Sequence, residues 1–300
     1  MLVYKQYDQA ALDRQYNNRL QVPDFARHLD RWESLSRQTE KEFSSIRDIS
    51  YGKLLREKLD IYPSPQPLSK TLIFIHGGYW HKSGKEDVQF IAKAFRAYNI
   101  TIVLINYPLA PAVSIDQLST SCREAVNWVY KNISAFNGDP DQLYVAGHSA
   151  GGHLAAMLLT TAPITPASYL PAGGHGREGE DRFDLAPDVI KGVCTISGLF
   201  NLIPIYLSDI NQALNMDKAT ALRNSPVNLL PATQCPLAIT VGRNETDEFL
   251  DQSNELYARW KESIPVKMLQ IEGLNHYSIL ETMLDPVSSL HKVVRGVMKI

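Results

Sequence analysis

The sequence predicts an α/β fold in which a mostly parallel central sheet is covered by helices on both faces. Short, continuous apolar runs that suit buried parallel strands alternate with longer segments of helical periodicity. The sequence contains no internal repeat and no low-complexity linker. With 300 residues, of which 44% are apolar, the chain can bury a large core, and we expect a single domain over residues 1–300.

The first 45 residues are predicted to form a helical arm that lies over the body of the domain. Leu12, Tyr16 and Leu20 recur at helical spacing. A second helical series begins at Phe25, after the break at Pro23.

The body begins with two strands, over residues 48–54 and 57–62, which we expect to pair as a hairpin. A proline-rich break follows. Residues 71–75 then form a continuous apolar run that ends at His76. Such a run suits a strand buried on both faces of a parallel sheet.

Strands and helices alternate along the rest of the chain, as is typical of a parallel sheet with crossover helices. The sequence predicts further strands over residues 100–105, 142–146, 189–196, 237–241 and 266–272, and helices over residues 87–97, 114–133, 150–161, 248–263 and 286–298. Residues 162–187 depart from this alternation because glycine, proline and charged residues predominate there. We expect a long irregular loop, which is either a lid or a plain surface insertion.

The strongest chemical signal is the segment Gly147-His148-Ser149-Ala150-Gly151. It follows directly on a predicted strand and precedes a predicted helix, the context in which the serine of Gly-x-Ser-x-Gly acts as a nucleophile. Glycine is needed on both sides of the serine because side chains there would collide with the neighbouring strand and helix. The helix also points its positive end at the site. We therefore predict a serine hydrolase with an α/β-hydrolase fold and Ser149 as its nucleophile.

A second motif, which begins at His76-Gly77-Gly78, follows an earlier buried strand. Acyl transfer to a serine creates an oxyanion that preorganised donors must stabilise. In this fold one donor is the amide after the nucleophile, here Ala150, and the others come from the loop after the third strand. Because two adjacent glycines let the backbone turn its amides inward, we expect Gly78 and Tyr79 to complete the oxyanion hole.

The base and the acid are predicted from the chain order of nucleophile, acid and histidine. His276 follows the last predicted strand, and its neutral imidazole can take the serine proton and return it to the leaving group. The acid is expected after the strand over residues 237–241, where spacing alone does not choose between Glu245 and Asp247. A serine, a histidine and oxyanion donors suffice for this chemistry, so neither a metal nor an organic cofactor is predicted.

Together, these residues resemble the kynurenine formamidase (arylformamidase) branch of the α/β hydrolases, over most of the chain from Tyr16 to His276. The most specific part is residues 76–80, because this branch carries His-Gly-Gly-x-Trp where ordinary esterases of the hormone-sensitive lipase group usually carry His-Gly-Gly-Gly. Other similar segments are residues 106–111, 147–153, 196–200 and 275–280.

The resemblance implies hydrolysis of N-formyl-L-kynurenine to L-kynurenine and formate in tryptophan degradation. In that family the acid stands three residues before a Glu-Phe pair, which selects Glu245 here and leaves Asp247 in reserve. A formyl group needs almost no acyl pocket, and Tyr79 and Trp80 beside the oxyanion hole could narrow it. Trp80 is therefore expected either to bind substrate or to pack in the core.

Two other functions are open to this sequence. A carboxylesterase for short-chain acyl esters would use the same triad, and only the pocket would distinguish it. A non-catalytic binding protein on this scaffold is disfavoured because both Ser149 and His276 are in place. We expect a small-molecule substrate, either an aryl formamide or a small ester, and leave a homodimer open.

Composition excludes several other classes of protein. The net charge of -2 gives no basic excess that would indicate nucleic acid. No apolar stretch reaches the roughly 20 residues of a membrane span, and the N-terminus lacks the pattern of a secretory signal, so we expect a cytoplasmic protein without a membrane partner. Cys122, Cys194 and Cys235 are too widely spaced for a zinc site or a disulfide framework, and we expect buried thiols.

Overall fold

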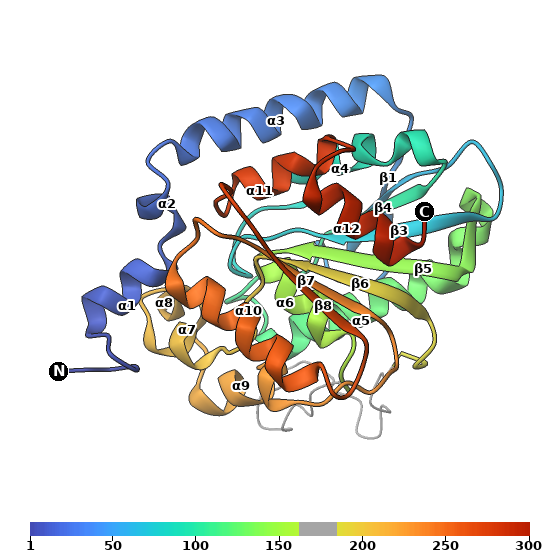
Figure 1. Cartoon of the computed structure of the whole chain (residues 1–300). Helices are drawn as coiled ribbons and strands as arrows, with labels where there is room; N and C mark the ends of the chain where they lie inside the picture. Colours follow the sequence, from blue (N-terminus) through green and yellow to red (C-terminus); the bar gives the residue numbers. More distant parts are fainter. Residues whose placement is uncertain (162–184) are drawn as a thin grey trace.

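The computed structural model describes residues 1–161 and 185–300, and its centre is one eight-stranded sheet (Figure 1). The strands lie in the order β1-β2-β4-β3-β5-β6-β7-β8. Their bounds are β1 (Ile46–Ser50), β2 (Lys58–Tyr62), β3 (Ser69–Ile75), β4 (Thr101–Ile105), β5 (Gly138–His148), β6 (Ile190–Ile196), β7 (Leu237–Gly242) and β8 (Val266–Ile271). β1 and β2 pair antiparallel, as do β2 and β4, and every other pairing in the sheet is parallel. The predicted mostly parallel sheet is confirmed.

Helices cover both faces of the sheet (Figure 1). One face carries α3 (Phe25–Glu42), α4 (Phe90–Ala94), α11 (Ser278–Glu281) and α12 (Ser289–Met298), and the other carries α5 (Ile115–Asn132), α6 (Ala150–Met157) and α10 (Asp247–Trp260). Successive strand residues point to opposite faces. Leu72 and Phe74 of β3 therefore pack with the first group of helices, and Ile73 and Ile75 with the second.

Shorter helices complete the described part of the chain. They are α1 (Gln9–Tyr16), α2 (Asn18–Gln21), η1 (Lys85–Val88), η2 (Arg96–Tyr98), η3 (Ile133–Phe136), α7 (Ile203–Leu207), α8 (Asn211–Leu214), α9 (Lys218–Arg223), η5 (Pro226–Asn228) and η6 (Thr282–Leu284). In residues 1–161 and 185–300, no helix combines the length and the apolar composition that crossing a bilayer requires.

The N-terminal arm reaches both faces of the sheet. Leu12 and Tyr16 of α1 are buried in the core that contains α10, whereas Trp32 of α3 is buried in the core that contains α4 and α12. The chain between them therefore passes the edge of the sheet. This passage brings residues 16–19 to the site described below.

Two predicted helices differ from the structure. Instead of one helix over residues 87–97, the chain forms the three short helices η1, α4 and η2. The Asp87 carboxylate accepts a hydrogen bond from the Gly84 amide and so caps the start of η1. The helix predicted over residues 150–161 ends at Met157, whose carbonyl oxygen accepts hydrogen bonds from the side chains of Arg123 and Thr160. Of the loop predicted over residues 162–187, residues 162–184 lie outside the described residues.

The three cysteines are confirmed as buried, unpaired thiols. Cys122 lies in α5 and Cys194 in β6, where burial raises the pKa of each thiol. Burial likewise raises the pKa of Cys235, just before β7.

Candidate active site

The residues predicted as nucleophile, base and acid meet at the edge where the parallel strands end. Ser149 follows β5, Glu245 follows β7 and His276 follows β8. The Nε2 atom of His276 lies 3.0 Å from Ser149 Oγ, and its Nδ1 atom lies 2.7 Å from Glu245 Oε2. With a neutral imidazole protonated on Nδ1, the serine hydroxyl donates to His276, which donates to Glu245. The three side chains thus form one buried hydrogen-bonded chain.

A tight turn presents the Ser149 hydroxyl. Ser149 has φ 57° and ψ -121°, a strained conformation for a residue with a side chain, and its amide donates to the Ile196 carbonyl oxygen at 2.8 Å. Gly151 allows the turn to approach β3, because a Cβ there would lie 2.1 Å from the Ile75 carbonyl oxygen. Close packing of the turn against β3 therefore requires glycine at position 151.

Replacing this glycine is expected to destabilise the fold. Gly151→Ala should lower the free energy of unfolding by about 3 kcal/mol, because the added methyl group meets backbone atoms of β3 that cannot rotate away. Urea unfolding followed by circular dichroism measures the change. Gly296→Ala is the matched control, since a Cβ on Gly296 in α12 meets nothing within 4 Å and alanine is the better helix former. Equal stability of the two variants would contradict this account of the turn.

The structure distinguishes the two acids that the sequence left open. Glu245 contacts His276, and its Oε1 atom accepts hydrogen bonds from Ser197 Oγ at 2.5 Å and from the Gly242 amide at 2.8 Å. Asp247 is exposed in the first turn of α10, where a carboxylate complements the helix dipole. The carboxylate oriented toward the imidazole therefore belongs to Glu245. Ser197, which the sequence analysis missed, holds that carboxylate in place.

Backbone amides expected to form the oxyanion hole lie at the same edge. Gly78 and Tyr79 line the cavity that contains Ser149, and both have positive φ, 105° and 48°. Within the described residues, the amides of Gly78, Tyr79 and Ala150 donate to no protein acceptor. Free amides beside a serine hydroxyl are the donors that a developing oxyanion requires.

Hydrogen bonds on both sides hold this turn. The Tyr79 hydroxyl donates to the Tyr16 carbonyl oxygen at 2.6 Å, which ties the turn to the N-terminal arm. On the other side, the Tyr107 hydroxyl donates to the His76 carbonyl oxygen at 3.0 Å, and the two rings stack with centroids 4.3 Å apart. The turn is therefore supported by parts of the chain that are distant in sequence.

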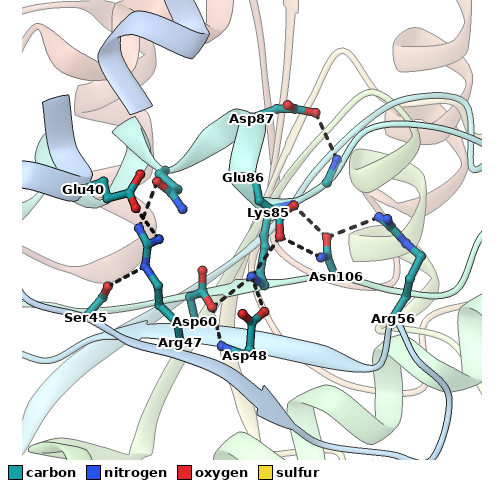
Figure 2. A network of polar contacts seen from close by, with 12 residues as sticks. Glu40, Ser45, Arg47, Asp48, Arg56, Asp60, Lys85, Glu86, Asp87 and Asn106 are labelled. Atoms are coloured by element: carbon teal, nitrogen blue, oxygen red, sulfur yellow. Dashed lines mark hydrogen bonds and ion pairs between the residues drawn. The ribbon is translucent and has the colours of Figure 1, made fainter. Parts of the chain in front are cut away.

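The turn at residues 76–80 begins the loop between β3 and η1. Figure 2 shows the polar network that holds the end of this loop next to η1. Arg56 donates to the Ser83 carbonyl oxygen at 2.7 Å, and the Lys85 amide donates to Asn106 Oδ1 at 2.7 Å. The Lys85 ammonium is buried 3.0 Å from the carboxylate of Asp60. Burial lowers the pKa of Lys85, but the adjacent carboxylates outweigh this effect and raise it. The loop from β3 to η1 is thus attached to β2 and to the chain after β4.

Three other histidines near the site have structural contacts. His148 and His153 form hydrogen bonds with the carbonyl oxygens of His276 and Asn224, at 2.9 and 2.7 Å. Burial lowers the pKa of His153, like that of His76, to about 4, and it lowers the pKa of His148 well below its usual range. These imidazoles are neutral at pH 7. Their hydrogen bonds give these histidines a structural role beside the site.

The expectation that Trp80 binds substrate is not met in this structure. Its side chain is fully buried, and its indole Nε1 donates to His153 Nδ1 at 3.1 Å. Tyr79, not Trp80, lines the cavity. The core-packing alternative therefore describes Trp80, whose indole is held in the core by His153.

A cavity of about 690 Å³ lies over Ser149 and His276. Part of its wall comes from elements that the sequence analysis did not assign to the site, including Arg19 of α2, Trp32 of α3 and Ile210 before α8. No motif marks these residues, since only the docking of the arm and of α8 brings them here.

In the described ranges, no group of three or more His, Cys, Asp or Glu side chains is arranged to hold a metal ion.

Comparison with known proteins reveals similarity to one family model and to curated relatives. Residues 59–260 match the BD-FAE family model. The kynurenine formamidase of Salmo salar is 31% identical over 250 residues, which cover 80% of this chain and 78% of that protein. The kynurenine formamidase of Danio rerio is 30% identical over 288 residues, which cover 93% and 91%.

Solved structures share the fold. A protein from Silicibacter sp. TM1040, for which a thioesterase activity has been suggested, is 26% identical, with a TM-score of 0.79 over 94% of this chain and 98% of that chain. The carboxylesterase EstE1, cloned from a metagenomic library, is 16% identical, with a TM-score of 0.64 over 93% and 96%. The predicted α/β-hydrolase fold is confirmed.

Proposed function

The chain belongs to the BD-FAE family and to the kynurenine formamidase family of α/β hydrolases, and from this premise we propose that it hydrolyses N-formyl-L-kynurenine to L-kynurenine and formate. The observation that carries the choice of substrate is the similarity to kynurenine formamidases over most of the chain. The buried chain of hydrogen bonds from Ser149 through His276 to Glu245 supplies the chemistry, which a carboxylesterase would share. It supplies a nucleophile, a base and an orienting acid to a cavity that a small aromatic substrate can enter.

The first step transfers the formyl group to the enzyme. Ser149 Oγ attacks the formyl carbon while its proton moves to His276 Nε2. The carbonyl oxygen becomes an oxyanion, which the amides of Gly78, Tyr79 and Ala150 stabilise. When the carbon–nitrogen bond breaks, His276 gives the proton to the aniline nitrogen, and L-kynurenine leaves with its amino group restored.

The second step removes the formyl group by hydrolysis. Water attacks the formyl ester on Ser149 while His276 takes one of its protons. A second oxyanion forms and collapses, and His276 returns the proton to Ser149. Formic acid leaves and releases its own proton to water, which gives formate. Glu245 accepts the Nδ1–H hydrogen bond throughout and stabilises the imidazolium that forms in each step.

Comparing substrates tests this proposal against the carboxylesterase alternative. We expect kcat/KM for N-formyl-L-kynurenine to exceed that for p-nitrophenyl acetate and p-nitrophenyl butyrate by about tenfold or more, because binding contacts with the aryl leaving group add to the shared machinery. Formation of kynurenine and of p-nitrophenolate is followed by absorbance, and the rate of Ser149→Ala is subtracted as background. A strong preference for butyrate without any formamide turnover would overturn the formamidase assignment and leave the esterase.

A cytoplasmic location is part of the proposal. Cys122, Cys194 and Cys235 are free thiols. Unpaired cysteines are usual in compartments that keep thiols reduced.

A further inference from the structure

An aromatic surface extends from the proposed base toward the mouth of the cavity. The rings of His276 and Tyr277 have centroids 5.8 Å apart, and Tyr277 lines the cavity together with Trp32. The Tyr277 ring also lies 6.2 Å from Phe25 and 6.0 Å from Trp32, both in α3. An aryl group next to the scissile bond would therefore contact Tyr277 and Trp32.

Beyond this aromatic surface lies Arg19 of the N-terminal arm. Its guanidinium carbon is 5.3 Å from the centroid of the Phe25 ring. Arg19 also acts on Tyr277: burial raises the pKa of that phenol, and the guanidinium counteracts the rise. Moving outward from Ser149, the cavity thus presents an imidazole, an aromatic ring and a guanidinium.

A second cation, Lys82, lines the cavity near Arg19. Burial lowers the pKa of the Lys82 ammonium, and the charge of Arg19 lowers it further. In the part of the chain that the structure describes, neither cation has a carboxylate within ion-pair distance. An anion bound between them would relieve their mutual repulsion.

Carboxylates in the same wall leave these cations unmatched. Four of them line the cavity: Asp30, Glu33, Asp87 and Asp209. Glu33 pairs with Arg37, and Asp87 accepts from the Gly84 amide. Asp30 and Asp209 form no ion pair within the described residues, and none of the four carboxylates lies within ion-pair distance of Arg19 or Lys82. No carboxylate of the wall therefore occupies the place of an anionic ligand beside these two cations.

We propose that Arg19 and Lys82 form a carboxylate-binding site that selects aryl formamides with a carboxylate on the leaving group. The inference rests on the proposed function, and it assigns the two cations to the amino-acid end of the substrate. The spatial order of hydroxyl, aromatic surface and cations matches the order of formamide, aryl ring and carboxylate in N-formyl-L-kynurenine. Arginine offers two parallel N–H donors to a carboxylate, and lysine adds a point charge.

Two substrates that differ only at the amino-acid end test the site. N-formyl-L-kynurenine carries a carboxylate and an ammonium group, whereas 2-formamidoacetophenone retains the aryl formamide and the ketone without either. Arg19 and Lys82 are cations, so the carboxylate is the group that they would bind. Arg19→Gln and Lys82→Gln should lower kcat/KM for the charged substrate by about 10- to 100-fold, mainly through KM. The loss on the neutral substrate should be at least tenfold smaller. Lys53→Gln is the matched control, because Lys53 is exposed in the β1–β2 turn and does not line the cavity.

The rates of the wild type and the variants on the two substrates distinguish failure of the carboxylate site from failure of the proposed function. Equal losses on both substrates would assign Arg19 and Lys82 a merely structural role and overturn the carboxylate site, as would full activity of both variants on the charged substrate. A wild-type enzyme that hydrolyses both formamides with equal efficiency would also overturn the site while leaving the proposed function standing. A wild-type enzyme that hydrolyses neither would overturn the proposed function and the site with it. Arg19→Lys keeps the positive charge but not the two parallel N–H donors, so its kcat/KM for the charged substrate should lie between those of Arg19→Gln and the wild type.

Discussion

Ser149→Ala is expected to lower kcat/KM for every substrate of this enzyme by at least about 10⁴-fold. The variant removes the hydroxyl that lies 3.0 Å from His276 Nε2, on a residue that lines the cavity. Oxyanion donors and substrate contacts remain, so the residual rate stays above that of the uncatalysed reaction. Steady-state kinetics with N-formyl-L-kynurenine or an activated ester measures the loss.

Stability measurements show whether this loss is chemical or structural. Alanine keeps the Cβ atom, so the strained backbone of residue 149 is unchanged and the melting temperature should stay within a few degrees of wild type. Ser34→Ala, an exposed serine of α3, is the matched control and should retain full activity. Folded Ser149→Ala protein with more than one-hundredth of the wild-type rate would rule out Ser149 as the nucleophile.

The parts of the site that were predictable are those determined by a few consecutive residues. The turn around Ser149 needs glycine at positions 147 and 151, because a Cβ atom at either position would collide with backbone atoms. The Gly-x-Ser-x-Gly pattern therefore identifies this turn from five residues. Its place between a strand and a helix could also be predicted, because both flanking segments have clear periodicity. Parallel strands end at one edge of a sheet, so the chain order alone brought His276 to the same place.

The parts that were not predictable depend on how distant segments dock. Glu245 and Asp247 are two residues apart and chemically alike, and only the start of α10 at Asp247 separates a buried carboxylate from an exposed one. Arg19 carries no motif, and it reaches the cavity because α1 and α3 pack on opposite faces of the sheet. Helices α7, α8 and α9 have four to six residues each, too few for hydrophobic periodicity to reveal them.

Glu245→Gln is expected to lower kcat by about 10³- to 10⁴-fold, although glutamine has nearly the same shape as glutamate. The Oε1 atom of Glu245 already accepts from Ser197 Oγ and from the Gly242 amide. The carbonyl oxygen of glutamine must occupy that position, which turns its NH2 group toward His276 Nδ1. His276 can then accept only at Nδ1, so its proton moves to Nε2, the nitrogen that faces Ser149. An imidazole in this tautomer cannot take the serine proton.

Asp247→Asn is the matched control for this variant, because it removes the same charge two residues away. Asp247 is exposed, so its loss should change kcat by less than about threefold and leave the melting temperature close to that of wild type. Steady-state kinetics at saturating substrate gives both values on one scale. The opposite ranking, with Asp247→Asn inactive and Glu245→Gln active, would transfer the role of the acid to Asp247. The expected result, a large loss of kcat in Glu245→Gln with an unchanged KM, would locate the defect in proton transfer, since the residues that hold the substrate remain in place.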